Sequence, residues 1–505
     1  ALGPGTRLTA REVGLLSALG RDEVPVRARP TVGIVSTGDE LVRPGDPLDS
    51  ARGEIYDVNS YTVAAAVEEA GGDPRLYPHD GEAATAAGPE RGDSPVGDDY
   101  DEMERVLREA AAECDLVLSS GSTSASAVDV IYRVIEDGGE LLLHGVAVKP
   151  GKPMLIGRLA GSAYVGLPGY PVSALTIFRT FVAPAIREAA GLPEPRTATV
   201  TGRMAVRERY GEGRLRLMPV GLVEGGDGAV DGGADDLLVY PVDKGSGATT
   251  SLVEADGVVE MHPDTEYLDA GERVTVRLFS PDVRPPTLFS VGEDDPALSR
   301  LLDRVERPRH LPVGSREGLR RLRDGVPDVA VVAGPTEREV EATDVGSWTR
   351  EWGLVVPAGD PDGVDGVASL VDDDLRFVNR TAASGLRRSF DAALDDLAAE
   401  RGVERADLTD AIDGYGVGVR AHESPARAVL AGDRDVGLGL RATAAKLDLG
   451  FVPLGEQAVR ALAAPSRVGK AGVAALRDAI GDDDAFAVLA GYERGAVRSS
   501  NEATR

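Results

Sequence analysis

Apolar and polar positions follow two different spacing patterns along the first part of the chain. Runs of consecutive apolar residues predict buried strands, and apolar residues spaced three or four apart predict helices. The strands are expected at 31–37, 73–77, 115–120, 141–148 and 162–166, and the helices at 59–70, 100–113, 128–135 and 172–190. Strands that alternate with helices are typical of a doubly wound sheet with parallel strands, so residues 27–192 are predicted to form a doubly wound α/β domain.

Two segments of this region do not follow the alternating pattern. Thr9–Leu19 has the apolar spacing of one short helix with Thr9 as its N-cap. Residues 1–26 are expected to be the end of a preceding domain, which implies further sequence upstream. Residues 81–100 are rich in Gly, Ala, Asp and Pro and predict a flexible insertion.

The remainder of the chain changes character twice. Residues 193–282 alternate like strands, and glycine pairs mark turns, so a small all-β barrel domain is predicted. After a proline-rich linker, residues 285–500 are predicted to form a second α/β domain. Its strands are expected at 287–291, 328–334, 353–357, 375–379, 435–440 and 449–454, and its helices at 297–305, 316–323, 384–401, 425–431 and 470–476.

The charge balance excludes several classes of partner. The 505 residues include 84 Asp and Glu against 55 Lys and Arg, a net charge of −29. A nucleic-acid binder held by phosphate contacts needs a basic face, and so does a surface that seeks anionic lipid, so neither partner is expected. No apolar window is long enough for a transmembrane helix, and no secretory signal is visible. We therefore expect a cytoplasmic protein.

Individual residue types add two points. Only five of the 55 basic residues are lysines, and this acidic, lysine-poor composition is halophile-like, although a GC-rich genome that favours arginine codons is the alternative. The single cysteine, Cys114, excludes an internal disulfide and any multi-cysteine metal site.

Two loops at predicted strand ends carry candidate chemistry. STGDEL (36–41) follows the first strand, at the sheet edge where ligands bind in α/β proteins, and Asp39 and Glu40 are candidate Mg²⁺ ligands. SSGSTSASAVD (119–129) lies between a buried strand and a helix, where small residues, hydroxyls and free N–H groups suit a phosphate. Asp129 suits a phosphate that carries Mg²⁺. The alternatives are a solvated turn and an ordinary strand–helix turn.

A third motif brings two of the five lysines together. In VAVKPGKPMLIG (146–157), Lys149 and Lys152 flank a stiff Pro-Gly turn. Two cations held close in so acidic a chain indicate a polyanionic ligand, with a plain surface turn as the alternative. VGLPGYPVSA (165–174) is a strand-to-helix turn fixed by two prolines.

These four motifs, in this order and spacing, resemble those of molybdopterin molybdenumtransferases and the similar E domain of gephyrin. The resemblance covers about residues 1–280. It includes 244–257 and 270–279, which match the family's C-terminal β-barrel, whereas the N-terminal part of the family has no counterpart. The resemblance implies a homodimeric enzyme of molybdenum cofactor biosynthesis. Such an enzyme inserts molybdate, or tungstate, into adenylylated molybdopterin with Mg²⁺ and releases AMP.

The resemblance also implies roles for individual residues. The expected catalytic residues are Glu40, Asp129, Lys149 and Lys152. The expected Mg²⁺ ligands are Asp39, Glu40, Asp80 and Asp129. The expected substrate-binding residues are Thr37, Gly38, Ser120, Gly121, Ser122, Ser124, Pro168 and Gly169.

Two departures from the family pattern leave an alternative open. Ser122 stands where the family has a second glycine, and Tyr170 stands where it has asparagine. Loss of the glycine narrows backbone freedom in the loop. The alternative is a non-catalytic sensor or adaptor that binds molybdopterin or an oxyanion.

The last third resembles a periplasmic-binding-protein-like domain, through segments 314–325, 352–391 and 432–454. This resemblance implies two lobes that close on a small ligand. Strand–helix turns place free N–H groups where an anion or a pterin-like ligand is stabilised. The expected ligand residues are Ser315, Ser384, Arg387, His422 and Ser424. A lobed domain that serves only as an interaction surface is the alternative.

Overall fold

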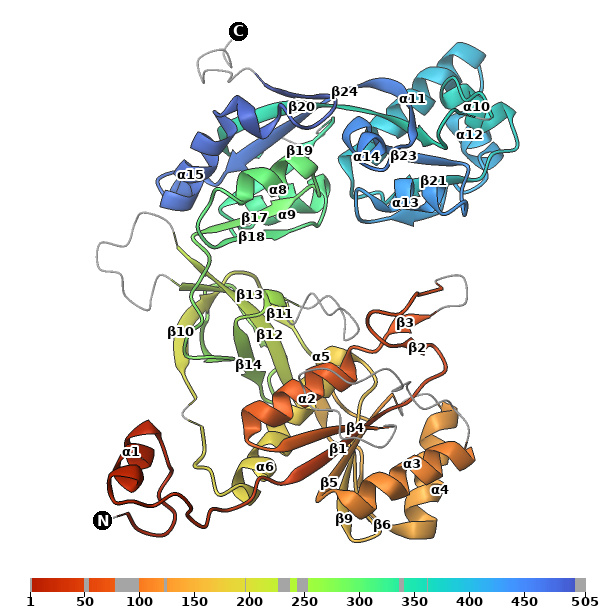
Figure 1. Cartoon of the computed structure of the whole chain (residues 1–505). Helices are drawn as coiled ribbons and strands as arrows, with labels where there is room; N and C mark the ends of the chain where they lie inside the picture. The colour runs from red at the N-terminus through yellow and green to blue at the C-terminus, as the bar shows by residue number, and fades with distance from the viewer. Residues whose placement is uncertain are drawn as a thin grey trace.

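The computed structural model describes residues 2–49, 54–77, 100–121, 125–195, 197–225, 237–242, 253–335, 340–360 and 362–495, with the backbone alone for 125–130. Residues 81–99 of the predicted insertion at 81–100 lie outside the described ranges. The chain runs from an α/β domain through a barrel to a two-lobed domain at the other end of the molecule (Figure 1). No helix in the described segments is long and apolar enough to cross a membrane.

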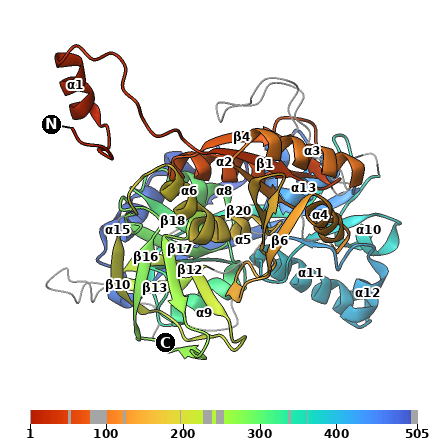
Figure 2. The ribbon, with the colours of Figure 1, turned by 90° about the horizontal axis from the view of Figure 1, so that it is seen from below.

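The N-terminal helix stands apart from the rest of the chain. Helix α1 (Ala10–Ala18) begins at the predicted N-cap Thr9, whose capping box is completed by Glu12. It has no buried residue, and an extended segment joins it to the α/β domain (Figure 2).

The first domain is built on a mixed six-stranded sheet. Its strands lie in the order β4 (Asp73–Tyr77), β1 (Thr31–Ser36), β5 (Leu116–Ser120), β9 (Ser162–Leu167), β8 (Leu155–Leu159) and β6 (Gly139–His144). The first four are parallel, as predicted, but β8 is antiparallel to both neighbours. Strand β8 was not predicted, because its apolar residues directly follow the two-lysine turn. The strand predicted at 141–148 divides into β6 and β7 (Val148–Lys149).

Helices cover both faces of this sheet. Val32 and Ile34 of β1 point to one face and pack with α2 (Asn59–Ala70), α5 (Pro171–Ile177) and α6 (Ala183–Ala189). Val35 points to the other face, which α3 (Tyr100–Glu113) and α4 (Ala125–Gly138) cover. The predicted helix 172–190 is interrupted by the π-turn η2 (Phe178–Val182) between α5 and α6. The fold is therefore doubly wound, as predicted.

The second domain is a closed barrel. Its strands follow the order β13 (Leu237–Pro241), β10 (Thr199–Met204), β16 (Arg273–Leu278), β14 (Gly257–Met261) and β12 (Leu215–Glu224), and β12 pairs again with β13. β11 (Glu208–Arg209) and β15 (Tyr267–Leu268) form a separate two-stranded ribbon, as do β2 (Leu41–Val42) and β3 (Ile55–Tyr56) of the first domain. β7 of the α/β domain adds to the free side of β12, so the two domains share a sheet.

The third domain has two lobes joined by long crossover strands. Its sheet order is β18 (Pro308–Leu311), β17 (Leu288–Gly292), β19 (Val329–Ala333), β24 (Gly450–Ala463), β20 (Thr343–Val356), β23 (Val436–Leu440), β21 (Phe377–Arg380) and β22 (Gly418–Val419), with β25 (Tyr492–Arg494) beside β20. Lobe one carries α8 (Pro296–Leu302), α9 (Ser315–Arg323) and α15 (Ala471–Ile480). Lobe two carries α10 (Val367–Asp372), α11 (Gly385–Arg401), α12 (Arg405–Ala411), α13 (Ser424–Leu430) and α14 (Arg441–Lys446) (Figure 1). The 14-residue strands β20 and β24 run through both lobes.

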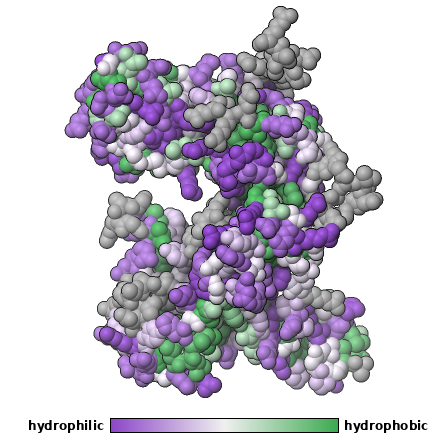
Figure 3. Space-filling view, turned by 180° about the vertical axis from the view of Figure 1, so that it is seen from behind, coloured by the Kyte–Doolittle hydropathy of each residue, from purple (hydrophilic) through white to green (hydrophobic). Residues whose placement is uncertain are grey.

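Lobe one rests on the barrel through specific contacts. Both terminal nitrogens of Arg309 donate to the carboxylate of Asp256, at 2.7 and 2.8 Å. The ring of Tyr240 stacks on Phe289, with 4.4 Å between the ring centres. Seen from behind, the surface is mainly hydrophilic, and an indentation separates lobe two from the α/β domain (Figure 3).

Candidate functional site

A cavity of about 1150 Å³ lies where the α/β domain meets the barrel. Seven of the residues predicted to act in catalysis or substrate binding line it: Thr37, Glu40, Gly121, Lys149, Lys152, Pro168 and Gly169. Several residues that were not predicted also line it, among them Asp57, Asn59, Tyr170, Arg214 and Arg216. The cavity is the candidate functional site because each of the four predicted motifs contributes residues to its lining.

The loops after β1 and β5 touch directly. The backbone N–H of Thr37 donates to the carbonyl of Ser120 at 2.9 Å. Gly121 has φ +103°, and a Cβ atom there would lie 2.0 Å from the Thr37 carbonyl oxygen. Only glycine fits this position, so the glycine of the serine-rich loop fixes one wall of the cavity.

Two buried polar residues at the start of α2 hold these loops in place. Asn59 donates from Nδ2 to the Ser120 hydroxyl and to the Gly169 carbonyl, both at 2.7 Å. The carboxylate of Asp57 accepts from the Ser36 hydroxyl and from the Ser60 N–H, both at 3.1 Å. The start of this helix was predicted at Asn59, but the roles of Asp57 and Asn59 were not. The available signal for them is the Asp-x-Asn pattern at the helix start.

The basic residues of the site come from both domains. β7 pairs with β12 so that Lys149 lies beside Arg216, and Arg214 precedes the paired segment. Glu212 forms ion pairs with Lys149 and Arg214, and the hydrogen bond from Lys149 is the largest of the effects that lower the pKa of Glu212. Lys152 is exposed and has no ion-pair partner in the described part of the chain. Barrel and α/β domain together make one wall of the cavity basic.

The predicted metal ligands are only partly described. Asp39 and Glu40 are both exposed, and only Glu40 lines the cavity. Two predicted substrate-binding residues, Gly38 and Ser120, are not part of the cavity lining. The Glu40 carboxylate lies directly over Gly38. Asp80, Ser122 and Ser124 lie outside the described residues, and for Asp129 only the helical backbone is described. Within the described residues, no three His, Cys, Asp or Glu side chains gather as a metal site.

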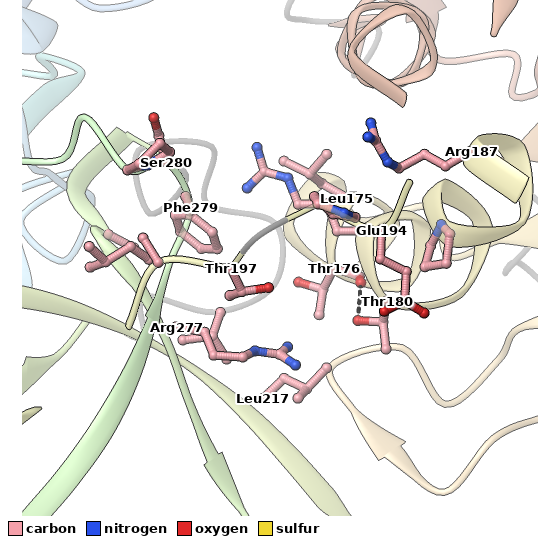
Figure 4. Close-up of a pocket in the computed structure, with 18 of the residues that line it drawn as sticks. Leu175, Thr176, Thr180, Arg187, Glu194, Thr197, Leu217, Arg277, Phe279 and Ser280 are labelled. Carbon is pink, nitrogen blue, oxygen red and sulfur yellow. Dashed lines mark hydrogen bonds between the residues drawn. The ribbon is translucent and has the colours of Figure 1, made fainter. Parts of the chain in front are cut away.

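A second cavity of about 930 Å³ lies between α5–η2–α6 and the barrel, and none of the predicted site residues line it. Figure 4 shows Leu217 and Phe279 around it. Its arginines are engaged within the protein. Arg277 pairs with Glu260 at 2.6 Å, and the guanidinium of Arg179 lies 4.8 Å from the Phe279 ring centre. The first cavity is the better candidate for an anionic ligand, because the predicted motif residues line it and one of them, Lys152, has no ion-pair partner within the described residues.

In the third domain, two of the predicted ligand residues, Ser315 and Ser384, come together at the helix starts of α9 and α11. Both bond to the carboxylate of Glu293, a residue of the chain that was not predicted. Arg387 instead pairs with Asp391 at 2.9 Å, and its guanidinium lies 4.0 Å from the ring centre of Tyr415.

The predicted ligand residue His422 also contacts a carboxylate of the chain itself, that of Asp294. The backbone N–H of His422 donates to Asp294 at 2.8 Å, and its ring Nδ1 lies 3.0 Å from the same carboxylate. Burial alone raises the pKa of Asp294, but the bonds from His422 bring it down to about 2. Ser424 begins α13 two residues further on.

Family models match three parts of the chain. A family model described as probable molybdopterin binding domain matches residues 82–188. The MoeA C-terminal region (domain IV) matches 201–279, and the PBP superfamily domain matches 306–481.

Relatives and solved structures cover part of the chain. Molybdopterin molybdenumtransferase 2 of Mycobacterium tuberculosis is 39% identical over 40% of this chain and 47% of its own length. Molybdopterin molybdenumtransferase of Haemophilus influenzae is 30% identical over 55% of this chain and 63% of its own. A MoeA structure from Pyrococcus horikoshii, 35% identical, covers 55% of this chain and 62% of that chain with a TM-score of 0.43. The chain thus spans about half to just under two-thirds of the length of these relatives. The chain carries MoeA-like molybdopterin molybdenumtransferase domains followed by a PBP-like domain, as the motifs predicted.

Proposed function

We propose that the first two domains act in molybdenum cofactor biosynthesis by binding adenylylated molybdopterin, inserting molybdate and releasing AMP. The observation that carries this proposal is the single cavity that collects Lys149 and Lys152 of one motif with Thr37 and Gly121 of two others. Such a substrate is a polyanion, and the basic wall between the domains matches its charge.

The phosphates of the substrate are assigned to the basic wall. Lys149, Lys152, Arg214 and Arg216 supply four positive charges there, and Arg216 also pairs with Glu208 at 2.7 Å. Glu212 neutralises part of this charge by pairing with Lys149 and Arg214. A phosphate group offers those two cations a stronger, multiply charged acceptor, so we expect it to displace Glu212 on binding.

The pterin ring is assigned to the part of the cavity lined by Asn59. The Oδ1 atom of Asn59 is buried and has no hydrogen-bond partner in the described residues. A buried acceptor left unpaired is costly, and an N–H group of a pterin would satisfy it. The two bonds that Asn59 donates hold this acceptor in a fixed orientation.

The acidic residues fit the oxygen ligands that Mg²⁺ prefers. Glu40 and Asp57 both line the cavity and present carboxylates. We propose Glu40 as a ligand, with Asp39, Asp80 and Asp129 completing the set. When bound, Mg²⁺ neutralises phosphate charge as the phosphoanhydride is broken.

One observation favours a second candidate function, a sensor that binds the pterin without catalysis. Tyr170 lines the cavity with 59% of its surface exposed, at the position where the family has asparagine. Release of AMP from adenylylated molybdopterin in the presence of molybdate separates the two functions, because a sensor binds the substrate and leaves it intact.

Lys152→Ala is expected to weaken the binding of adenylylated molybdopterin about tenfold or more, since one charge-assisted hydrogen bond contributes about 1.5–3 kcal/mol. The melting temperature should stay unchanged, because an exposed charge adds little to stability. Isothermal titration calorimetry gives the affinity. Lys446→Ala is the control, since Lys446 is an exposed lysine paired with Glu423 in the third domain. Equal affinities for the two variants would contradict the assignment.

A further inference from the structure

The two lobes of the third domain meet around one buried carboxylate. Glu293 follows β17 of lobe one and is 1% exposed. Its Oε1 atom accepts from the N–H of Ser315 at 3.0 Å, the hydroxyl of Ser315 at 2.8 Å and the N–H of Gly385 at 2.6 Å. Its Oε2 atom accepts from the hydroxyl of Ser384 at 3.3 Å. Four donors from the first turns of α9 and α11 thus surround one anionic group.

Buried arginines complete the surroundings of this carboxylate. Arg350 is fully buried and lies 3.5 Å from Glu293 and 2.7 Å from Asp295. Arg380 is 2% exposed, and its charge interacts with Glu293 and Asp294. Its Nε and Nη1 atoms have no hydrogen-bond partner within the segments that the structure describes. Two helix N-termini, two hydroxyls and guanidinium groups are the donor set that binds tetrahedral oxyanions in proteins.

The lobes are in backbone contact on both sides of Glu293. A Cβ atom on Gly314 of lobe one would lie 2.4 Å from the carbonyl oxygen of Ala383 in lobe two. A Cβ atom on Gly385 would lie 2.4 Å from the carbonyl oxygen of Ala333 in lobe one. The cleft is therefore closed around the carboxylate.

We propose that this is an oxyanion-binding site that the chain fills with its own Glu293. The carboxylate of lobe one takes the place of a free sulfate- or molybdate-like ion, holds the lobes together and sets the specificity of the cleft by excluding such ions. Ser315 and Ser384 keep the anion-binding role expected for them, with a side chain as the occupant. This inference concerns the third domain alone and does not depend on the function proposed for the first two.

Glu293→Ala in the full chain empties the site while leaving its donors in place. It is expected to bind one more equivalent of sulfate or molybdate per chain than the wild type, measured by equilibrium dialysis at constant ionic strength in KCl. Any oxyanion bound in the first cavity is common to both proteins, so the difference reports the third domain. Glu293→Gln is the matched control, because it fills the same space and should gain no equivalent.

The melting temperature of the variant is a second readout, and it remains informative if the Glu293→Ala protein folds poorly. The Glu293→Ala protein should melt at a lower temperature than wild type and recover with sulfate or molybdate, but not with chloride at equal ionic strength. If it does not fold alone, refolding should succeed only with the oxyanion. Equal stoichiometry in the variant and the wild type, or no recovery with either oxyanion, would overturn the proposal.

Discussion

Arg350→Leu is expected to lower the free energy of unfolding of the third domain by about 3–5 kcal/mol, because it leaves buried carboxylates without their counter-charge. Arg350 is fully buried, and its Nη1 atom donates to Asp295 at 2.7 Å. Its Nε and Nη2 atoms donate to Gln457 at 2.9 and 2.6 Å. The hydroxyl of Tyr492 also donates to Asp295, so one substitution disturbs contacts that join β20, β24, β25 and the N-cap of α8.

Tryptophan fluorescence during urea unfolding measures this effect in the right domain. The chain has two tryptophans, and Trp348 and Trp352 both lie in β20 of the third domain. Arg460→Leu is the matched control, since Arg460 pairs with Asp344 at 2.9 Å on the surface of the same sheet, where a pair contributes about 0–1 kcal/mol. A loss for Arg350→Leu no larger than the control's would show that the buried network is not a main source of stability.

Gly121→Ala is expected to weaken the binding of adenylylated molybdopterin by at least about tenfold. Its Cβ atom would lie 2.0 Å from the Thr37 carbonyl oxygen, so the loops after β1 and β5 must separate. The positive φ adds a backbone cost of about 1–3 kcal/mol. Thermal unfolding followed by circular dichroism and calorimetric titration measure the two effects.

Gly161→Ala separates the backbone cost from the contact. Gly161 has φ +99°, but a Cβ atom there meets nothing within 4 Å. This variant should lose stability through φ alone and bind the substrate like the wild type. If both alanine variants bind equally well, the contact between Thr37 and Gly121 does not shape the site.

Local signals explain why parts of the fold were predictable from the sequence. The predicted bounds of 59–70, 73–77 and 100–113 agree with those of α2, β4 and α3. The first of these helices ends where Gly71 adopts a left-handed conformation, as the glycine pair indicated. In contrast, only the apolar C-terminal end of β20 was predicted, because its first ten residues mix polar and apolar positions and are fixed by pairing with β24.

In the candidate site too, residues in local motifs were predicted, and residues placed by strand pairing were not. The motif residues Thr37, Gly121, Lys149 and Lys152 were predicted, because each lies in a loop with recognisable chemistry. Arg214 and Arg216 were not, since only the register of β12 on β7 brings them to the cavity.

The group that fills the anion site of the third domain could not be predicted either, because its contacts join distant parts of the chain. The serines at its helix starts were predicted as anion ligands. The anion is Glu293, which lies 22 residues from Ser315 and 92 from Gly385 in the sequence. No local sequence pattern predicts a contact between residues so far apart in the sequence.

Calorimetric titration of the whole chain with adenylylated molybdopterin, in variants of the two cavities, shows whether the first cavity is the substrate site. We expect saturable binding at one site, weakened about tenfold or more in both Lys149→Ala and Arg214→Ala, because each removes a charge-assisted bond from the wall shared by the two domains. Arg277→Ala, in the second cavity, should bind like the wild type. Absence of binding by the wild type, or weakening by Arg277→Ala and not by the other two variants, would contradict the assignment of the first cavity as the substrate site.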